Sequence, residues 1–525
     1  MADEKASSGA ANPAGGHGSL LRTFNRIFSR HSTSIALLLM LPMLFAPSMN
    51  PGALNMMGDP DIWWHLADAR YFFTHHHVIF ADPYAFTVVG VRWINWEWLS
   101  EIPYWFSYQA FHLQGIYLVA WLVLGLNLIL VYWRGYWISR HAGAAFWAAC
   151  VGFTLELANS GPRTIAIAYL ALSAELAILE AYERGHRRLL WLLPPLFALW
   201  INLHGIWFIG FATLVLYIAC GFLRLNLGIF QQEPMATADR KRFFAVLGVT
   251  FAALFLNPYG WRLLYNPVDM MLKQHLSISV ISEWRPLNLS SPEGYVVTAA
   301  VLLMLAANAI RPRKWTIFEF LIVLLAFYAA IDHVRFSFLA AVLITPMLAR
   351  DFQRAFTTDS GEKTIPLMNL LLCVLAAGLV IHYYPSEKTL QKKLDYYFPL
   401  KMISSIQPTW RTFNIDYVGG RMDFDFKPIF IDSRFDIFDH QGVLHDYLAI
   451  ENIGDTPLKM LDNYNVDHAL LTKGMGLAYV LSHAPGWHLD SSETCGSETY
   501  LLFARTAAPA VAPPRFTPAQ EAPTK

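Results

Sequence analysis

Apolar stretches, separated by short polar segments, recur along most of the chain. They lie near residues 33–50, 116–133, 143–158, 164–181, 189–203, 205–224, 242–256, 294–310, 316–331, 335–349 and 365–383. A helix needs about 20 residues to cross a bilayer, and the shorter stretches reach this length through their flanks. The pattern therefore predicts about eleven transmembrane helices, with a kink where Pro194 and Pro195 interrupt one of them.

The composition agrees with this prediction. Hydrophobic residues make up 55% of the chain and charged residues only 15%, against about 25% charged residues in a typical soluble domain. The net charge of zero gives no reason to expect a nucleic-acid partner. The four cysteines show no pairing pattern, so we expect neither a disulfide nor a cysteine metal site. The chain is therefore expected to be an α-helical multi-pass membrane protein.

The distribution of basic residues predicts the orientation in the membrane. Three arginines precede the first apolar stretch, which places the N-terminus in the cytoplasm. The later basic loops also fall on the cytoplasmic side, provided that residues 97–113 lie on the membrane surface and do not cross it. The loop 51–115 and the region after residue 383 are then outside: in the periplasm or at the exterior of a bacterium, or in the lumen of a eukaryotic compartment. We expect the inner (cell) membrane of a bacterium.

Composition changes along the chain predict four segments. Residues 1–32 are small and polar and are expected to be a disordered cytoplasmic N-terminus, followed by a membrane domain over residues 33–383. Residues 384–505 alternate apolar strands with helices, which predicts a small α/β domain outside the membrane. Residues 506–525 are rich in alanine and proline and are expected to be a disordered tail. In the α/β domain we expect strands at 427–438, 466–472 and 499–505, and helices at 457–464 and 477–484.

The segment 58–101, in the first outer loop, is the most polar and most aromatic part of the chain. Its titratable residues are Asp59, Asp61, His65, Asp68, Asp82, Glu97 and Glu101. Residues 61–73 fit a helix with Asp61, His65 and Asp68 on one face and an apolar opposite face. We expect this helix to lie flat on the membrane with Trp63 and Trp64 at the level of the lipid headgroups, and a second surface helix over 97–113. So many titratable groups at one membrane surface indicate chemistry or binding there.

Cationic side chains are expected in the later outer turns. They are Arg163, His204, Arg262, Lys273, Arg285, His333 and Arg335. Carboxylates that face cations at a membrane surface suit a reaction between a hydroxyl group and a lipid phosphate. A carboxylate can act as the general base toward the hydroxyl, and an arginine or a divalent cation can hold the phosphate.

The sequence GDPDIWWHLADAR after the first apolar stretch, the two surface helices, the multi-span body and the soluble tail resemble the C-type superfamily of integral-membrane glycosyltransferases. That superfamily includes protein O-mannosyltransferases and aminoarabinose transferases. The resemblance implies a catalytic acidic residue in the first outer loop, for which Asp61 is the first choice and Asp59 the second. It also implies transfer of a sugar from a polyprenyl-phosphate donor to a hydroxyl group of a glycan, lipid or protein acceptor.

The chain departs from the aminoarabinose-transferase pattern at NWEWLSEIP, where Glu97 is kept but the lysine of the family is missing. The phosphate-holding role of that lysine then passes to an arginine such as Arg163 or Arg335. With His65, Glu97 and His204, these arginines form the expected substrate-binding set. The cofactor stays open: a divalent cation such as magnesium would be held by Asp59 and Asp61, because magnesium prefers carboxylate oxygens.

Each functional interpretation has a structural alternative. Asp61 is also suited to cap the helix that it begins, and Asp59 to form a turn. His65 is also suited to packing beside the tryptophans. The run His75–His77 does not indicate a zinc site, because consecutive histidines do not share a helix face. As a whole, the chain is also compatible with a transporter or lipid-handling protein, which would carry ionisable groups near the bilayer midplane.

Overall fold

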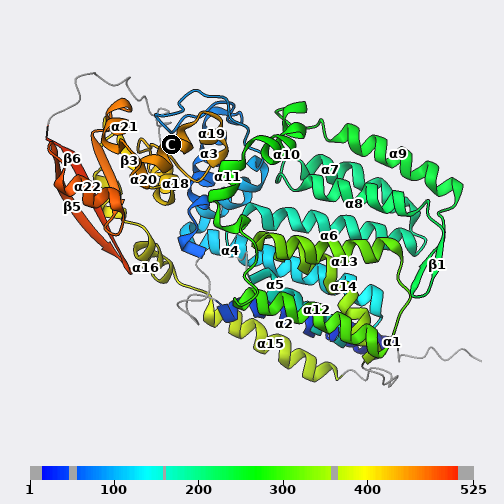
Figure 1. The fold of residues 1–525 in the computed structure, drawn as a ribbon. Coiled ribbons are helices and arrows are strands. Elements are labelled where there is room, and N and C mark those ends of the chain that lie inside the picture. The colour runs from blue at the N-terminus through cyan, green and yellow to red at the C-terminus, as the bar shows by residue number, and fades with distance from the viewer. Residues whose placement is uncertain (1–14, 46–55, 158–160, 356–364, 507–525) are drawn as a thin grey trace, which may run out of the picture.

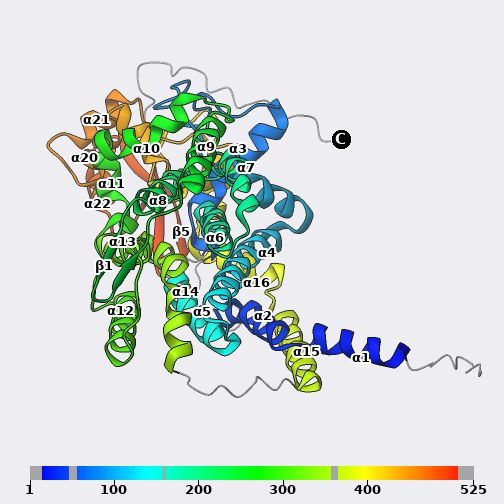
Figure 2. The ribbon, with the colours of Figure 1, turned by 90° about the vertical axis from the view of Figure 1, so that its right-hand side faces the viewer.

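The computed structural model describes residues 15–45, 56–157, 161–355 and 365–506. Figure 1 shows a stack of long helices on one side of the molecule and a sheet with short helices at the other end. The segments 1–14 and 507–525, where disorder was predicted, lie outside the described residues. Residues Gly15–Ile27 form helix α1, although the sequence predicted disorder there as well. Its leucines and Ile27 are largely exposed, and Figure 2 shows the helix extending away from the body.

Helices coincide with each of the eleven apolar stretches. They are α2 (Arg30–Met40), α4 (Trp98–Ser139), α5 (Ala142–Glu156), α6 (Thr164–Glu183), α7 (Leu193–Trp200), α8 (Trp207–Cys220), α9 (Thr237–Ala253), α12 (Pro292–Ile310), α13 (Ile317–Asp332), α14 (Ser337–Ala355) and α15 (Pro366–Tyr383). By length and composition, five of the described helical segments can cross a membrane. They are Leu20–Leu44, Trp98–Ser139, Thr164–Glu183, Pro292–Ile310 and Pro366–Tyr383, and α5 and α8 are shorter apolar helices. The chain is a multi-pass membrane protein.

The sequence predicted that Pro194 and Pro195 kink a long helix, and this prediction is wrong. They lie at the first positions of α7, which follows a short 3-10 helix over Arg187–Leu192. Proline fits the first turn of a helix because its missing N–H group would have no partner there. The apolar stretch is therefore divided into two shorter elements.

Helix α14 forms the centre of the helical body, where it packs against α4, α5 and α13. The contacts with α5 and α4 use small residues. A methyl group at Gly152 would come within 2.5 Å of the Thr345 hydroxyl, and one at Gly135 within 3.0 Å of the Ala349 methyl. Such small residues allow helix backbones to approach closely, which is the main source of packing energy between helices in lipid.

The predicted second surface helix is the first part of α4. The long helix is interrupted at His112, whose φ of 49° is not helical. The segment before His112 is thereby separated in direction from the apolar segment after it. This break supports the expectation that residues 97–113 do not belong to the span that follows.

Helix α3 (Asp61–His75) is present as predicted, but its predicted place at the headgroup level is wrong. Trp63 is completely buried and Trp64 is 8% exposed. The reason is that the C-terminal part of the chain covers this helix: α18 (Asp416–Phe424) packs along it, and Trp63 contacts the rings of Phe398 and Phe424. The tryptophans therefore stabilise an interface inside the protein.

The remaining elements of the membrane part are short. They are the 3-10 helices Leu41–Phe45, Met56–Gly58, Ser282–Trp284 and Val334–Phe336, the hairpin β1 (Leu225–Leu227) and β2 (Phe230–Gln232), and the helices α10 (Trp261–Lys273) and α11 (His275–Val280). The two short helices lie in the segment between α9 and α12, beside the C-terminal part of the chain.

The C-terminal part contains a four-stranded sheet in the order β3-β4-β6-β5. Its strands are β3 (Thr412–Asn414), β4 (His468–Thr472), β5 (Trp487–Cys495) and β6 (Glu498–Arg505), and its helices are α16 (Glu387–Tyr397), α17 (Leu400–Ser405), α18, α19 (Phe435–His440), α20 (Val443–Glu451), α21 (Pro457–Asn463) and α22 (Gly476–His483). β3 and β4 are parallel, and the other pairs are antiparallel. The predicted strands at 466–472 and 499–505 and both predicted helices are present.

The predicted strand at 427–438 is wrong. Residues 429–431 are fully buried, but they form only one isolated bridge, to Ala85 in the first outer loop, and helix α19 follows. The side chain of Asn414 takes the place of a neighbouring strand: it donates to the carbonyl of Ile431 and accepts from the N–H of Phe430. Burial therefore explains the apolar run, and side-chain hydrogen bonds satisfy its backbone without a sheet.

Candidate active site

The carboxylates Asp59 and Asp61 lie at the start of α3 and have different local roles. The backbone N–H of Asp61 donates to the Asp59 carboxylate at 3.0 Å, so Asp59 forms the turn. Asp61 is the first residue of α3, and the residue that caps the helix is Pro60, which makes no side-chain capping hydrogen bond. Oδ1 of Asp61 accepts from the Ser433 hydroxyl at 2.5 Å and from the Trp64 indole N–H at 3.4 Å. Within the described part of the chain, Oδ2 of Asp61 accepts no hydrogen bond.

The pKa of Asp61 lies near neutral pH. Burial raises the pKa of its carboxyl group from 3.8 to about 7, and the nearby charge of Asp59 acts in the same direction. The hydrogen bond from Ser433 and the charge of Arg163 oppose this rise because they favour the charged form. A carboxylate with a pKa near the ambient pH is well suited to accept and release a proton.

Arg163 lies beside this pair of carboxylates. It precedes α6, and its Nε donates to Oδ2 of Asp59 at 2.8 Å. Its Nη1 forms an ion pair with Glu283, which lies in a short helical turn between α11 and α12. The guanidinium group thus joins the turn at Asp59 to the short helical turn that contains Glu283.

Arg335 is the second arginine at the site. It lies in the turn between α13 and α14, and its guanidinium is 4.7 Å from the centre of the Trp284 ring. Burial lowers the pKa of Arg335, while the charges of Glu97 and Asp61 raise it. The structure therefore brings both arginines that were predicted to hold a phosphate to the same group of acidic residues.

Glu97 is the meeting point of four polar side chains. Trp96 Nε1 donates to its Oε1 at 2.7 Å, and the hydroxyl of Thr164 donates to its Oε2. The Nε2 atoms of His65 and His204 lie 3.3 Å and 3.2 Å from the two carboxylate oxygens. The site thereby links α3, the first outer loop, the start of α6 and the turn between α7 and α8.

Both histidines are held in the neutral form. Burial lowers the pKa of His65 from 6.5 to about 4 and lowers that of His204 well below 6.5. The Nδ1 of His204 accepts from the N–H of Ile206, so its single proton is on Nε2, toward Glu97. Burial also raises the pKa of Glu101 well above 4.5, and this acid contacts Nδ1 of His65 at 3.1 Å. The two ring nitrogens of His65 therefore lie between two carboxyl groups, Glu101 at Nδ1 and Glu97 at Nε2.

A second set of buried polar residues holds the loop in place. Asn95 donates to Asp68 at 3.0 Å and to Glu101 at 2.7 Å. Arg434, which is only 3% exposed, forms ion pairs with Asp82 at 2.8 Å and with Asp432 at 2.5 Å. The first of these pairs ties the C-terminal part of the chain to the first outer loop. A buried arginine paired in this way is costly to disturb, because breaking the pair leaves a charge without a partner.

Sequence reasoning missed Ser433 and Arg434. Both lie in the segment 427–438, whose apolar residues suggested a strand with a polar turn after it. The only signal was the run of polar residues that follows the apolar triplet 429–431. No spacing rule connects that run to Asp61 in the first outer loop.

Other cationic residues of the outer turns have their own partners. Lys273 pairs with Asp269 at 2.9 Å, and Nδ1 of His333 donates to the carbonyl of Trp284. Asp332 lies 3.4 Å from His333. His75 and His77 donate to the carbonyls of Tyr71 and Val78, which are ordinary structural contacts.

The proposed magnesium ligands do not form a complete site by themselves. Among the described residues, no group of three or more histidine, cysteine, aspartate or glutamate side chains is arranged to hold a metal ion. Asp59 is already paired with Arg163, which leaves Asp61 as the one carboxylate of the pair with an open oxygen. A divalent cation held by Asp59 and Asp61 stays a prediction, and no step below depends on one.

Solved structures share this fold. The crystal structure of the oligosaccharyltransferase of Archaeoglobus fulgidus, tethered to an acceptor peptide with the NVT sequon, matches with a TM-score of 0.55 and 11% identity over 84% of this chain and 69% of that chain. The apo form of the same enzyme matches with a TM-score of 0.52 and 13% identity over 88% and 70%. No family model and no curated protein sequence matches the chain.

A third structure is the archaeal oligosaccharyltransferase AglB from A. fulgidus in complex with an inhibitory peptide and a dolichol-phosphate. It matches with a TM-score of 0.56 and 12% identity over 90% of this chain and 74% of that chain. At such low identity the likeness establishes the fold and nothing finer. Over most of its length this chain therefore shares the fold of the A. fulgidus oligosaccharyltransferase.

Proposed function

We propose that this chain is a membrane glycosyltransferase that transfers a sugar from a polyprenyl-phosphate donor to a hydroxyl group at the outer face of the membrane, with Asp61 as the general base. The observation that carries the proposal is the state of Asp61. One of its oxygens is fixed by Ser433, the other accepts no hydrogen bond from the described residues, and burial raises its pKa to about 7. The shared fold supports the same class of reaction, since one of the similar structures was solved with a dolichol-phosphate.

The reaction is a substitution at the anomeric carbon of the donor sugar. Oδ2 of Asp61 takes the proton of the acceptor hydroxyl as its oxygen attacks that carbon. The bond between the anomeric carbon and the phosphate oxygen breaks, and the polyprenyl phosphate leaves with the electron pair. Asp61 then carries the proton and releases it to water before the next cycle.

Arg163 and Arg335 are the groups that hold the phosphate in this proposal. The negative charge on the leaving phosphate increases as its bond to the sugar breaks, so fixed guanidinium groups stabilise the transition state more than the bound donor. Glu97 fixes the surrounding residues, and His65 and His204 complete the substrate-binding set. Glycans, lipids and proteins are all acceptors that offer a hydroxyl group.

The test is the variant Asp61→Asn, which keeps the size of the side chain and its acceptor oxygen for Ser433. The purified protein in lipid nanodiscs is incubated with a radiolabelled polyprenyl-phosphate sugar and an envelope extract that supplies the acceptor. The wild type consumes the donor, and the variant is expected to lose this activity. Asp490→Asn, at an exposed carboxylate on β5, is the matched control and keeps wild-type activity. If Asp61→Asn transfers the sugar at the wild-type rate, Asp61 is not the general base.

A further inference from the structure

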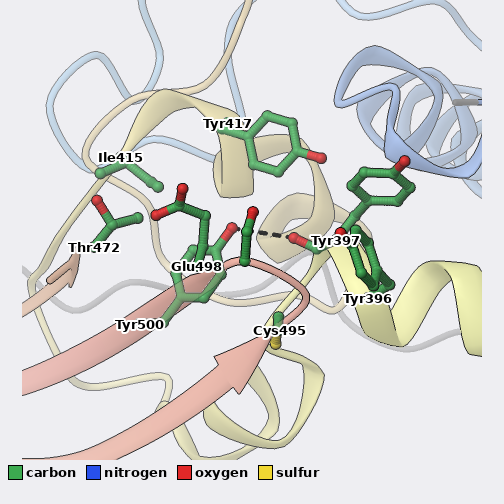
Figure 3. A pocket seen from close by; sticks show the side chains of 9 residues that line it. Tyr396, Tyr397, Ile415, Tyr417, Thr472, Cys495, Glu498 and Tyr500 are labelled. Atoms are coloured by element: carbon green, nitrogen blue, oxygen red, sulfur yellow. Dashed lines mark hydrogen bonds between the residues drawn. The ribbon is translucent and has the colours of Figure 1, made fainter. Parts of the chain in front are cut away.

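The C-terminal part of the chain contains a pocket that the proposed reaction does not yet use. Its volume is about 420 Å³, which lies within the usual range for ligand sites of about 300–1,000 Å³. Its lining includes four tyrosines and a glutamate: Tyr396, Tyr397, Tyr417, Tyr500 and Glu498. Figure 3 shows these side chains around one open space, with Thr472 at its edge.

The pocket borders the turn that carries the candidate carboxylates. The hydroxyl of Tyr417 donates to the backbone carbonyl of Gly58 at 2.9 Å. The ring of Tyr397 lies so close to Gly58 that a methyl group there would come within 3.0 Å of it. The charge of Asp59 is also close enough to raise the pKa of Tyr417, after the larger effect of burial. A ligand in the pocket is therefore next to the Gly58–Asp61 turn.

The lining offers fixed rings and hydrogen-bonding oxygens together. The ring of Tyr417 is stacked on Phe398, with centroids 5.0 Å apart and planes 7° apart, so its orientation is set. Tyr500 donates its hydroxyl proton to the carbonyl of Tyr397 at 3.0 Å, which leaves its oxygen lone pairs for a ligand. Glu498 is exposed, and its carboxylate forms no hydrogen bond or ion pair with the residues that the structure describes.

This combination matches the chemistry of a sugar. A pyranose ring presents apolar C–H faces, which pack on aromatic rings, and hydroxyl groups at its edge, which donate to carboxylate and phenol oxygens. A purely apolar ligand would cover phenol oxygens of the lining without offering them a hydrogen bond, and an anion would be repelled by the charge of Glu498. A neutral carbohydrate satisfies the rings and the oxygens together.

The position of the pocket distinguishes acceptor from donor. Arg163 reaches Asp59 from the start of α6, on the side of the membrane helices. Tyr417 reaches Gly58 from α18, on the side of the C-terminal part, which contributes every residue that lines the pocket. A lipid-linked donor approaches from the helices, so the pocket is on the opposite side of the turn.

We propose that this tyrosine pocket binds a sugar unit of the acceptor, so that the acceptor of the proposed transferase is a carbohydrate. The assignment to the acceptor depends on the proposed function, whereas the binding of a sugar can be tested without any transfer. The expectation is that the sugar unit held in the pocket directs a neighbouring hydroxyl group toward Asp61.

The experiment is saturation-transfer NMR of the purified chain in nanodiscs. The probes are the methyl glycosides of glucose, galactose, mannose and N-acetylglucosamine at millimolar concentration. At least one of them is expected to give a signal with the wild type. Glu498→Ala, which removes the carboxylate, and Thr472→Trp, which fills the space, are each expected to reduce the signal at least fivefold. Asp490→Asn is the control on the neighbouring strand and keeps the full signal.

Two further measurements separate the possible outcomes. Asp61→Asn is expected to bind the glycosides as the wild type does while losing transfer. A wild type that binds the glycosides but transfers no sugar from the donor would refute the proposed function and keep the sugar site. Addition of a polyprenyl-phosphate sugar is expected to leave the glycoside signal unchanged, and its loss would assign the pocket to the donor. Absence of signal for all four glycosides, or signals that survive both pocket variants, would overturn the proposal. Thermal unfolding of each variant shows whether a loss of signal comes from misfolding.

Discussion

Asp61 and Glu97 are two carboxylates of the same outer loop in opposite environments. Four polar side chains surround Glu97, from α3, the loop itself, α6 and the turn after α7. Asp61 is held through one oxygen only, and burial raises its pKa to about 7. A carboxylate with all its lone pairs in use fixes its neighbours, whereas one with an open oxygen and a pKa near neutrality can exchange a proton. The contrast separates the residue that reacts from the residue that supports the site.

The largest expected effect is that of Asp61→Asn on catalysis. Loss of a general base typically lowers a rate by about 10²- to 10⁴-fold, and we expect donor consumption to fall within this range. The stability of the fold is expected to change little, because the amide oxygen still accepts from Ser433. The measurement is initial donor consumption beside thermal unfolding of the same sample. If the variant unfolds at a much lower temperature than the wild type, Asp61 instead stabilises the fold, as Glu97 does.

Glu97→Gln is expected to act mainly on stability. The amide NH₂ group would face side chains that already donate, and at least one buried donor would lose its acceptor, at a cost of about 1–3 kcal/mol. Thermal unfolding in detergent should therefore occur at a lower temperature than in the wild type, and Asp490→Asn should be unchanged. If Glu97→Gln unfolds like the wild type but loses all transfer, Glu97 acts in the reaction itself.

The pH dependence of the transfer rate tests whether Asp61 exchanges the proton. A general base must be deprotonated, so the rate is expected to rise with pH through a midpoint near 7 and then to reach a plateau. Ser433→Ala removes a hydrogen bond that stabilises the charged form, so the pKa of Asp61 rises and the midpoint moves up by about one unit. The measurement is kcat/KM for the donor between pH 5.5 and 9.5, a range that reaches about 1.5 units below the wild-type midpoint and about 1.5 units above the shifted one. An identical profile in Ser433→Ala would show that another group sets the midpoint.

The smallest expected effect is that of Arg163→Lys. Lysine keeps the positive charge but not the planar fork that contacts Asp59 and Glu283 together. We expect the KM for the donor to rise by up to about tenfold, which corresponds to about 1.4 kcal/mol. Arg262→Lys, at an arginine that lines a separate pocket, is the control. A larger rise in KM for Arg262→Lys than for Arg163→Lys would indicate that the donor phosphate binds in the pocket lined by Arg262.

The helical body could be predicted because its signal is local. Every apolar stretch coincides with a helix, since the length and character of a span are visible within a window of about 20 residues. The loop 58–101 was likewise recognised from the number of titratable groups in it. The burial of helix α3 in this loop could not be predicted, because the residues that cover Trp63 lie in the C-terminal part of the chain.

The candidate site itself depends on contacts that no local pattern encodes. Arg163 is 104 residues from Asp59, and Ser433 is 372 residues from Asp61. Arg163 was identified only as one of several cations in the outer turns. Ser433 directly follows an apolar run whose backbone hydrogen-bonds to an asparagine side chain, so that segment resembled a strand in the sequence.

The hydrogen bond between Ser433 and Asp61 has a consequence for biosynthesis. The ribosome makes Asp61 372 residues before Ser433, so the membrane helices are complete while the carboxylate still lacks this partner. Assembly of the site therefore waits until the C-terminal part has been made and has packed on α3. A chain that ends before Ser433 would contain the membrane helices but not the hydrogen bond that fixes Oδ1 of Asp61.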